Sequence, residues 1–270
     1  MDKAAKVLGR VIKRYFSDGV ARASAQLAYY LFFSIFPVLI LVNNIISRLN
    51  VDIKSILLRF EYLFPAQIAD MLIDYIDYLR RIESPYMFVV SVFLTLYAMT
   101  RSLNSLLTSV RQAYRIKKAG TVNYMTAALL SAIILLSFFM LTAVILGGEF
   151  VIVKLEKYIN VPLSVNAFLR LLKFVLLPVY MFFILSGFYY IVPSRRYSFK
   201  YAIPGAMFAV VTITTVTTVF SYYVSHFSNY SLLYGSLAAV MILMIWLQLV
   251  SSVLILGGEL NDVLIEFNRD

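Results

Sequence analysis

Long apolar runs alternate with short polar segments along most of the chain. Each run has roughly 20 residues, the length of helix that crosses the ~30 Å hydrocarbon layer of a bilayer at about 1.5 Å per residue. The pattern predicts six membrane-spanning helices, at about residues 23–46, 85–107, 124–147, 168–192, 201–225 and 234–258. We therefore expect an all-α, polytopic membrane protein with a single transmembrane domain over residues 23–270.

The first 22 residues have a different, amphipathic pattern. Their apolar face comprises Val7, Leu8, Val11, Ile12, Tyr15 and Phe16, and Lys3, Lys6, Arg10, Lys13 and Arg14 lie mostly around the other face. Such a pattern is typical of a helix that lies on an anionic membrane surface. We predict an interfacial helix that ends near Asp18 and Gly19; a basic helix surrounded by water is the alternative.

Residues 48–84, between the first two spans, are mixed in character. Their apolar residues Leu72, Tyr75, Ile76, Leu79 and Ile82 recur at helical spacing. This pattern predicts one or two amphipathic helices on the extracytoplasmic side rather than a seventh span.

Composition and charge support a membrane protein. The chain is 61% hydrophobic and 14% charged, far from soluble averages. Its net charge of +10 comes from basic residues gathered between the spans, which argues against a nucleic-acid partner. With the N-terminus inside, 15 of the 24 basic residues fall on the cytoplasmic side and nine on the other. The positive-inside rule thus favours cytoplasmic termini.

Signatures of catalysis and metal binding are nearly absent from the sequence. There is no cysteine, and the single histidine, His226, lies in an aromatic connection after the fifth span. A metal-dependent hydrolase needs several convergent histidines or carboxylates. We therefore expect no enzyme activity, no cofactor and no metal.

A short internal echo suggests a repeat. Residues 141–150 (LTAVILGGEF) resemble residues 251–260 (SSVLILGGEL), and both close a span. Two three-span halves would be inverted relative to one another, as in several transporters. A chance similarity of two membrane helices is the alternative.

Polar residues within the spans are candidates for function because lipid penalises unpartnered polar groups. In the first span, Gln26, Tyr30, Ser34 and Pro37 share one face. This face either contacts a substrate or makes hydrogen bonds between helices.

The second span ends in another polar stripe, and the sixth contains the only tryptophan. The stripe comprises Arg101, Asn104, Ser105, Thr108 and Arg111. Arg101 needs an anionic partner. Either it pairs with Glu259 as a structural clasp, or it binds an anionic substrate.

Trp246 lies near mid-span, so its indole N–H is expected to find a partner inside the bundle.

Several of these segments resemble the YihY/BrkB family of bacterial inner-membrane proteins, once labelled ribonuclease BN. The segments are Gln26–Pro37, Arg101–Asn104, Pro204–Ala206, Phe220–Val224, Tyr234–Val240 and Gly257–Asn261. They occur in the family's order across almost the whole chain. Residues 112–118 match the family's pattern only loosely, so no role is carried onto them.

The resemblance implies a six-span protein of the bacterial plasma membrane that is suspected of moving lipid or another amphiphile between leaflets. We therefore expect a flippase-like or exporter-like transporter, with a non-transporting scaffold of the cell envelope as the alternative. Membrane lipids, including an anionic lipid or amphiphile, are the expected partners, and homo-oligomerisation is left open. The substrate-binding candidates are Gln26, Tyr30, Ser34, Pro37, Arg101, Asn104, Glu259 and Asn261.

Overall fold

A computed structural model describes residues 3–47, 66–79, 85–116, 124–141, 163–193, 197–227 and 237–268. Within these ranges the regular elements are helices, without a strand. They are α1 (Lys3–Ser17), α2 (Val20–Ser47), α4 (Ala66–Leu79), α5 (Pro85–Ala113), the helix Tyr124–Leu141, α7 (Leu163–Ile191), the 3₁₀ turn η2 (Phe199–Tyr201), α8 (Ile203–Phe227) and α10 (Leu237–Phe267).

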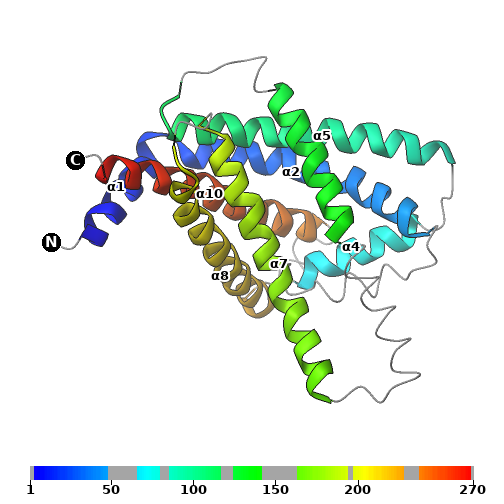
Figure 1. Ribbon diagram of the computed structural model, residues 1–270. Coiled ribbons are helices and arrows are strands. Elements are labelled where there is room, and N and C mark those ends of the chain that lie inside the picture. Colours follow the sequence, from blue (N-terminus) through cyan, green and yellow to red (C-terminus); the bar gives the residue numbers. More distant parts are fainter. Residues whose placement is uncertain are drawn as a thin grey trace.

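Three long helices form the centre of the bundle. Figure 1 shows α2, α5 and α10 running side by side, with α7 and α8 crossing them on one face. The helix Tyr124–Leu141 lies over α5, and a hydrogen bond of 3.1 Å between the hydroxyls of Thr100 and Ser131 joins the two. α1 and the end of α10 lie together, so the two described ends of the chain share one end of the molecule (Figure 1).

The structure has a helix at each of the six predicted span positions. Among the residues that the structure describes, four stretches are long and apolar enough to cross a membrane: Val20–Asn44, Tyr124–Leu141, Phe199–Val224 and Leu237–Phe267. α7 contributes the shorter apolar stretch Val175–Ile191. α5 is less apolar because it carries the polar stripe. The all-α, polytopic membrane class predicted from the sequence is confirmed.

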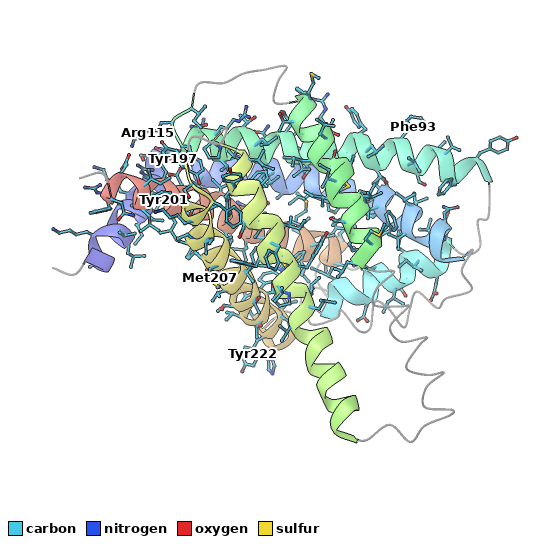
Figure 2. The ribbon with its side chains drawn as sticks, viewed as in Figure 1. Phe93, Arg115, Tyr197, Tyr201, Met207 and Tyr222 are labelled. Carbon is cyan, nitrogen blue, oxygen red and sulfur yellow. The ribbon has the colours of Figure 1, made fainter. Side chains whose placement is uncertain are left out.

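The outer surface of the bundle is apolar, as expected for contact with lipid. On the helix Tyr124–Leu141, five large apolar side chains are more than half exposed: Met125, Leu129, Ile133, Leu136 and Met140. Phe93 on α5 and Met207 and Tyr222 on α8, labelled in Figure 2, also lie outside the bundle. Water would penalise such a surface, whereas lipid tails would not.

The segment between the first two spans contains the amphipathic helix that the sequence predicted. In α4, Ile68, Leu72 and Ile76 are buried against α2 and α10, whereas Asp70 and Asp74 are exposed. The rest of the segment, residues 48–65 and 80–84, lies outside the described residues. So does most of the first copy of the proposed repeat, residues 142–150, and the repeat stays a prediction.

α8 and α10 pack closely against one another through two glycines, Gly205 and Gly257. A Cβ atom on Gly205 would collide with the carbonyl oxygen of Gly257, and one on Gly257 would collide with the hydroxyl of Tyr189. Asn261 bridges the crossing: its Oδ1 accepts a hydrogen bond of 2.7 Å from the Gly205 N–H, and its Nδ2 donates one of 3.3 Å to the Ala202 carbonyl. Small residues permit this close packing, and the asparagine fixes its register.

Further along the same pair of helices, the tryptophan finds the partner that was expected. The indole N–H of Trp246 on α10 donates a hydrogen bond of 3.1 Å to the Thr217 hydroxyl on α8. A buried indole donor is therefore satisfied within the bundle.

We expect Gly205→Ala to lower the midpoint of thermal unfolding in detergent, because the new methyl group forces α8 and α10 apart. Overpacking of this kind costs about 1–3 kcal/mol. The matched control is Gly187→Ala in α7, where nothing lies within 4 Å of the added Cβ. This control should be neutral or slightly stabilising, since alanine is favoured over glycine in helices by ~1 kcal/mol. Equal effects of the two substitutions would contradict the close crossing.

Candidate functional site

A polar cavity of about 410 Å³ lies between the first half of α2 and the second half of α5. It is lined by Asp18, Gly19, Arg22, Ala23, Gln26, Tyr30, Arg101, Asn104, Ser105, Thr108, Ser109, Gln112 and Tyr124. The α2 residues Arg22, Gln26 and Tyr30 recur at intervals of four, so they project from one face of the helix. Two polar helix faces therefore meet across the cavity.

The cations of the cavity have no carboxylate partner among the described residues. The Nη1 of Arg101 donates a hydrogen bond of 2.6 Å to the Tyr124 hydroxyl, and its Nε donates one of 3.3 Å to the Tyr97 hydroxyl. Neither Arg101 nor Arg22 lies within ion-pair distance of a described acid. Two guanidinium groups with one acid, Asp18, give the lining a net positive charge.

The amide oxygen of Asn104 lacks a hydrogen-bond partner within the described structure. This Oδ1 atom is shielded from solvent, and no described donor reaches it. Buried polar atoms are normally paired, so an orphaned acceptor on the lining residue needs an explanation. A rotation of the side chain that turns this atom toward the cavity would let a bound molecule or an ordered water satisfy it.

The structure brings together four of the eight predicted site residues, Gln26, Tyr30, Arg101 and Asn104, in this cavity. Ser34 is buried, and its hydroxyl donates a hydrogen bond of 2.7 Å to the Leu31 carbonyl of its own helix. Pro37 interrupts α2 further along and is not part of the lining.

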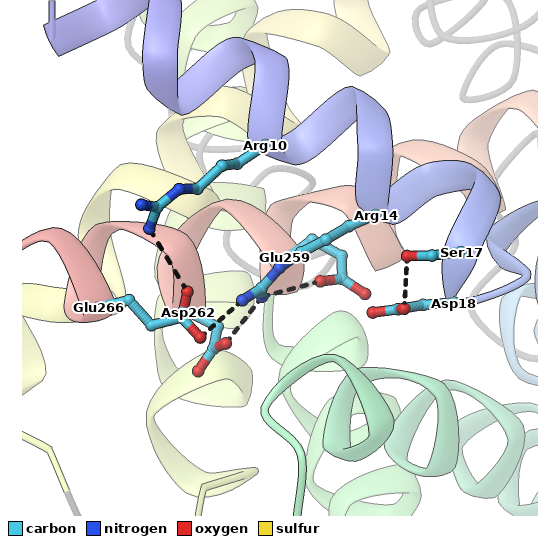
Figure 3. A network of polar contacts seen from close by, with 7 residues as sticks. All are labelled: Arg10, Arg14, Ser17, Asp18, Glu259, Asp262 and Glu266. Carbon is cyan, nitrogen blue, oxygen red and sulfur yellow. Dashed lines mark hydrogen bonds and ion pairs between the residues drawn. The ribbon is translucent and has the colours of Figure 1, made fainter.

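Of the two alternatives for Arg101, the clasp with Glu259 is wrong. Glu259, Asp262 and Glu266 on α10 instead surround Arg14 of α1, with N–O distances of 3.2, 2.7 and 2.8 Å (Figure 3). Arg14 is only 6% exposed. The sequence placed Arg14 on the solvated face of its helix, but α1 packs that part of its surface against α10. Glu259 therefore has a nearer cation than Arg101.

The remaining predicted residue, Asn261, belongs to the α8–α10 crossing described above. The stripe on α5 is likewise divided. Arg111 at its end is buried outside the cavity, and its Nε donates a hydrogen bond of 3.3 Å to the Val192 carbonyl. Polar residues of one sequence pattern thus serve two purposes, lining the cavity and joining helices.

The charge state of Arg14 follows from its surroundings. Burial alone would lower the pKa of its guanidinium, but the hydrogen bond and charge of Asp262, with the charges of Glu266 and Glu259, raise that pKa above its ordinary value. Arg14 is therefore positively charged at any physiological pH.

The corner between α1 and α2 connects the ion cluster to the cavity. α1 ends at Ser17, and Gly19 adopts a positive φ of 67°, which reverses the chain before α2 begins at Val20. A side chain there would be strained and would also press on the Arg22 guanidinium. The amide of Gln112 donates a hydrogen bond of 3.4 Å to the carbonyl of Asp18. The corner that follows α1 thus forms one wall of the cavity.

Comparison with known protein families shows the family to which this chain belongs. The family model described as virulence factor BrkB matches residues 11–270, which is nearly the whole chain. The chain belongs to the BrkB family.

Individual relatives of this BrkB-family protein differ in how much of it they cover. A Bacillus subtilis (strain 168) protein named as ribonuclease-like, YfkH, is 26% identical over 95% of this chain and 94% of its own length. A UPF0761 membrane protein of Pseudoalteromonas translucida is 42% identical over 27% of this chain and 24% of its own. One from Vibrio cholerae is 34% identical over 37% and 32%. No solved structure matches the chain.

The segments that carry the resemblance to the BrkB family divide between the two polar regions of the structure. The beginning of Gln26–Pro37 and both ends of Arg101–Asn104 line the cavity. Pro204–Ala206 and Gly257–Asn261 form the α8–α10 crossing, and Glu259 in the latter also joins the ion cluster.

Sequence reasoning missed several residues that the structure places at these sites, among them Arg22, Arg14 and Tyr124. Arg22 had a detectable signal, because it precedes Gln26 and Tyr30 at intervals of four on the same helix face. Arg14 had a detectable signal in its partners, because Glu259, Asp262 and Glu266 are spaced along one face of a helix and require a cation. Tyr124 had none, since its contact with Arg101 spans 23 positions and depends on how the next helix lies over α5.

We expect Arg14→Ala to destabilise the protein strongly, because it leaves three acids clustered without their cation. Breaking a buried ion pair from one side costs about 3–5 kcal/mol. Thermal unfolding of purified protein would measure the loss, and Arg10→Ala is the matched control. Arg10 is 46% exposed and 3.8 Å from Glu266, so its removal should cost no more than ~1 kcal/mol.

Removing the charge of Arg14 together with the charges of two of its acids tests why Arg14→Ala loses stability. The triple variant Arg14→Met, Glu259→Gln, Asp262→Asn should recover part of the stability that Arg14→Ala loses. If it is no more stable than Arg14→Ala, packing rather than charge explains the effect of Arg14.

Proposed function

We propose that this protein binds the headgroup of an anionic amphiphile in the cavity between α2 and α5 and moves that molecule between the leaflets of the bacterial plasma membrane. The observation that carries the proposal is the pair of arginines, Arg22 and Arg101, on a polar cavity without a described carboxylate partner. Arginine is the side chain best suited to phosphate and carboxylate, which it contacts through two parallel hydrogen bonds.

The size of the cavity favours a headgroup over a whole lipid. Small-molecule sites typically have volumes of about 300–1,000 Å³, and this cavity, at about 410 Å³, is at the lower end of that range. A molecule with acyl chains would leave them outside.

An exposed apolar row beside the cavity would accommodate an acyl chain. Tyr97, Phe93 and Val90 precede Arg101 by 4, 8 and 11 positions on α5 and are 61%, 70% and 54% exposed. Residues at these intervals lie on one face of a helix, so an apolar row leads directly away from the guanidinium. A charged group at one end of an apolar row matches the shape of an amphiphile.

Movement across the membrane requires helices that can bend. Pro37 in α2 and Pro178 in α7 interrupt the backbone hydrogen bonds of two helices in the bundle. Such breaks are tolerated in membrane helices and occur at transporter sites. With the termini in the cytoplasm, the cavity would lie near the inner surface, where anionic lipid is concentrated by basic residues.

A ribonuclease-like activity has less support from the cavity. Its described lining contains one carboxylate, Asp18, and no histidine. General acid–base hydrolysis uses paired groups of these types within reach of the substrate. The proposal is accordingly for a carrier and not an enzyme.

We expect Arg101→Ala to abolish the enrichment of one anionic lipid class around the protein. The measurement is lipid mass spectrometry on protein extracted in native-membrane nanodiscs. Loss of a charge-assisted contact worth ~1.5–3 kcal/mol weakens binding by about 10- to 100-fold. Arg101→Lys should retain an intermediate enrichment, because lysine keeps the positive charge but cannot make the two parallel hydrogen bonds of a guanidinium group. Lys200→Ala, an exposed cation away from the cavity, is the control.

Translocation of the enriched lipid is then measured in liposomes that contain each variant. Faster transfer between leaflets with wild type than with Arg101→Ala supports transport. Enrichment without transfer would favour the scaffold alternative. Bulk lipid composition around both proteins would refute the headgroup site.

Cysteine substitution tests whether the cavity is wet. The chain has no native cysteine, so each introduced thiol is unique. We expect Gln26→Cys, on the cavity lining, to react with a small water-soluble thiol reagent, and Ser34→Cys, buried two turns further along α2, to stay unmodified. Protection of both positions would mean that the polar face of α2 is packed against its neighbours.

A further inference from the structure

α1 presents three different faces, which the sequence pattern alone did not separate. At about 100° per residue, Val11, Arg14 and Tyr15 lie on one sector, and the structure packs this sector against the bundle. Leu8, Ile12 and Phe16 lie on a second sector and are 61%, 52% and 76% exposed. The predicted single apolar face is therefore divided into one packed sector and one open sector.

The third sector of α1 is basic. Lys6 and Lys13 are exposed there, and neither makes an ion pair with a described acid. Arg10, beside them, reaches Glu266 and lies 4.0 Å above the ring of Phe267. The open apolar row is thus flanked by free cations on one side and by the bundle on the other.

Connectivity places this helix at a membrane surface. α1 ends at Ser17, and α2, which is the first membrane-crossing helix, begins at Val20. Figure 1 shows α1 turning away from the direction of α2. Because only two residues separate α1 from α2, the end of α1 that carries Ile12 and Phe16 lies close to the membrane surface. Its exposed apolar row therefore meets either lipid or another protein at that depth.

We propose that α1 is a membrane-binding surface whose occupant is an anionic lipid leaflet: Leu8, Ile12 and Phe16 enter the acyl boundary, and Lys6 and Lys13 contact anionic headgroups. The charge pattern favours an anionic lipid leaflet, since lysines without a described acidic partner, beside an exposed apolar row, complement a negatively charged interface. The Arg14 cluster holds the helix on α10 at the rotation that directs the apolar row outward. This surface is separate from the cavity, because none of these five residues lines it.

The test uses the full chain with a single introduced cysteine carrying an environment-sensitive fluorophore. Phe16→Cys places the probe on the apolar row, and Lys13→Cys places it on the basic sector less than one turn away. Both positions are exposed, so the fold tolerates substitution there, and Ile12→Cys is a second probe of the apolar row. Each protein is reconstituted in nanodiscs of zwitterionic lipid alone or with about a third of anionic lipid.

We expect the probe at position 16 to emit at shorter wavelength and to be quenched by lipids that carry a spin label in the acyl chain. The probe at position 13 should emit as in water. Replacing Lys6 and Lys13 by glutamine in the Phe16→Cys background should shift the embedded fraction toward water by about fivefold per lysine, equivalent to ~1 kcal/mol each. The shift should occur in anionic nanodiscs and be lost in zwitterionic ones.

Three results would overturn the proposal. An aqueous probe at positions 12 and 16 in every lipid would mean that α1 is a solvated helix. A shielded probe that acyl-chain quenchers do not reach would mean that protein covers the row. Equal insertion with and without anionic lipid would remove the role of the lysines. None of these results depends on whether the cavity binds a headgroup.

Discussion

The ion cluster of Arg14 with three carboxylates is the constraint on which this end of the molecule depends. Glu259, Asp262 and Glu266 lie in the last three turns of α10, and Glu266, in the final turn, also meets the negative end of the helix dipole, which disfavours an acid. Arg14 approaches from the last turn of α1, a position that suits a cation. One buried side chain therefore offsets two unfavourable effects, the repulsion among the three acids and the interaction of Glu266 with the dipole.

The same cluster explains why α10 continues beyond the span expected from hydropathy. The apolar pattern ends near residue 258, but α10 extends to Phe267 because its last turns contact protein in place of lipid. α1 covers one side through Arg14, and the Asn261 bridge to α8 holds another. Helix length in this protein is set by packing as well as by bilayer thickness.

The fold could be predicted far better than the candidate site. Apolar runs of membrane length fix helices locally, and the amphipathic period of α4 was equally clear, because both follow from spacing within one segment. Polar residues are harder, since their partners lie elsewhere in the chain. Gln26 and Arg101 do meet across a cavity, whereas Glu259 pairs with Arg14, 245 positions away. Choosing between two cations for one acid requires the packing of α1, which hydropathy does not contain.

Asp18 and Gly19 belong to two structures at once, the corner that ends α1 and the wall of the cavity. A shared wall couples cavity binding to the docking of α1. If a molecule in the cavity favours one position of the corner, it changes how firmly α1 is held. Thermodynamic reciprocity then requires the docking of α1 to change the affinity of the cavity by the same factor. The lipid composition of one leaflet would then act as an effector of cavity occupancy, without a dedicated regulatory domain.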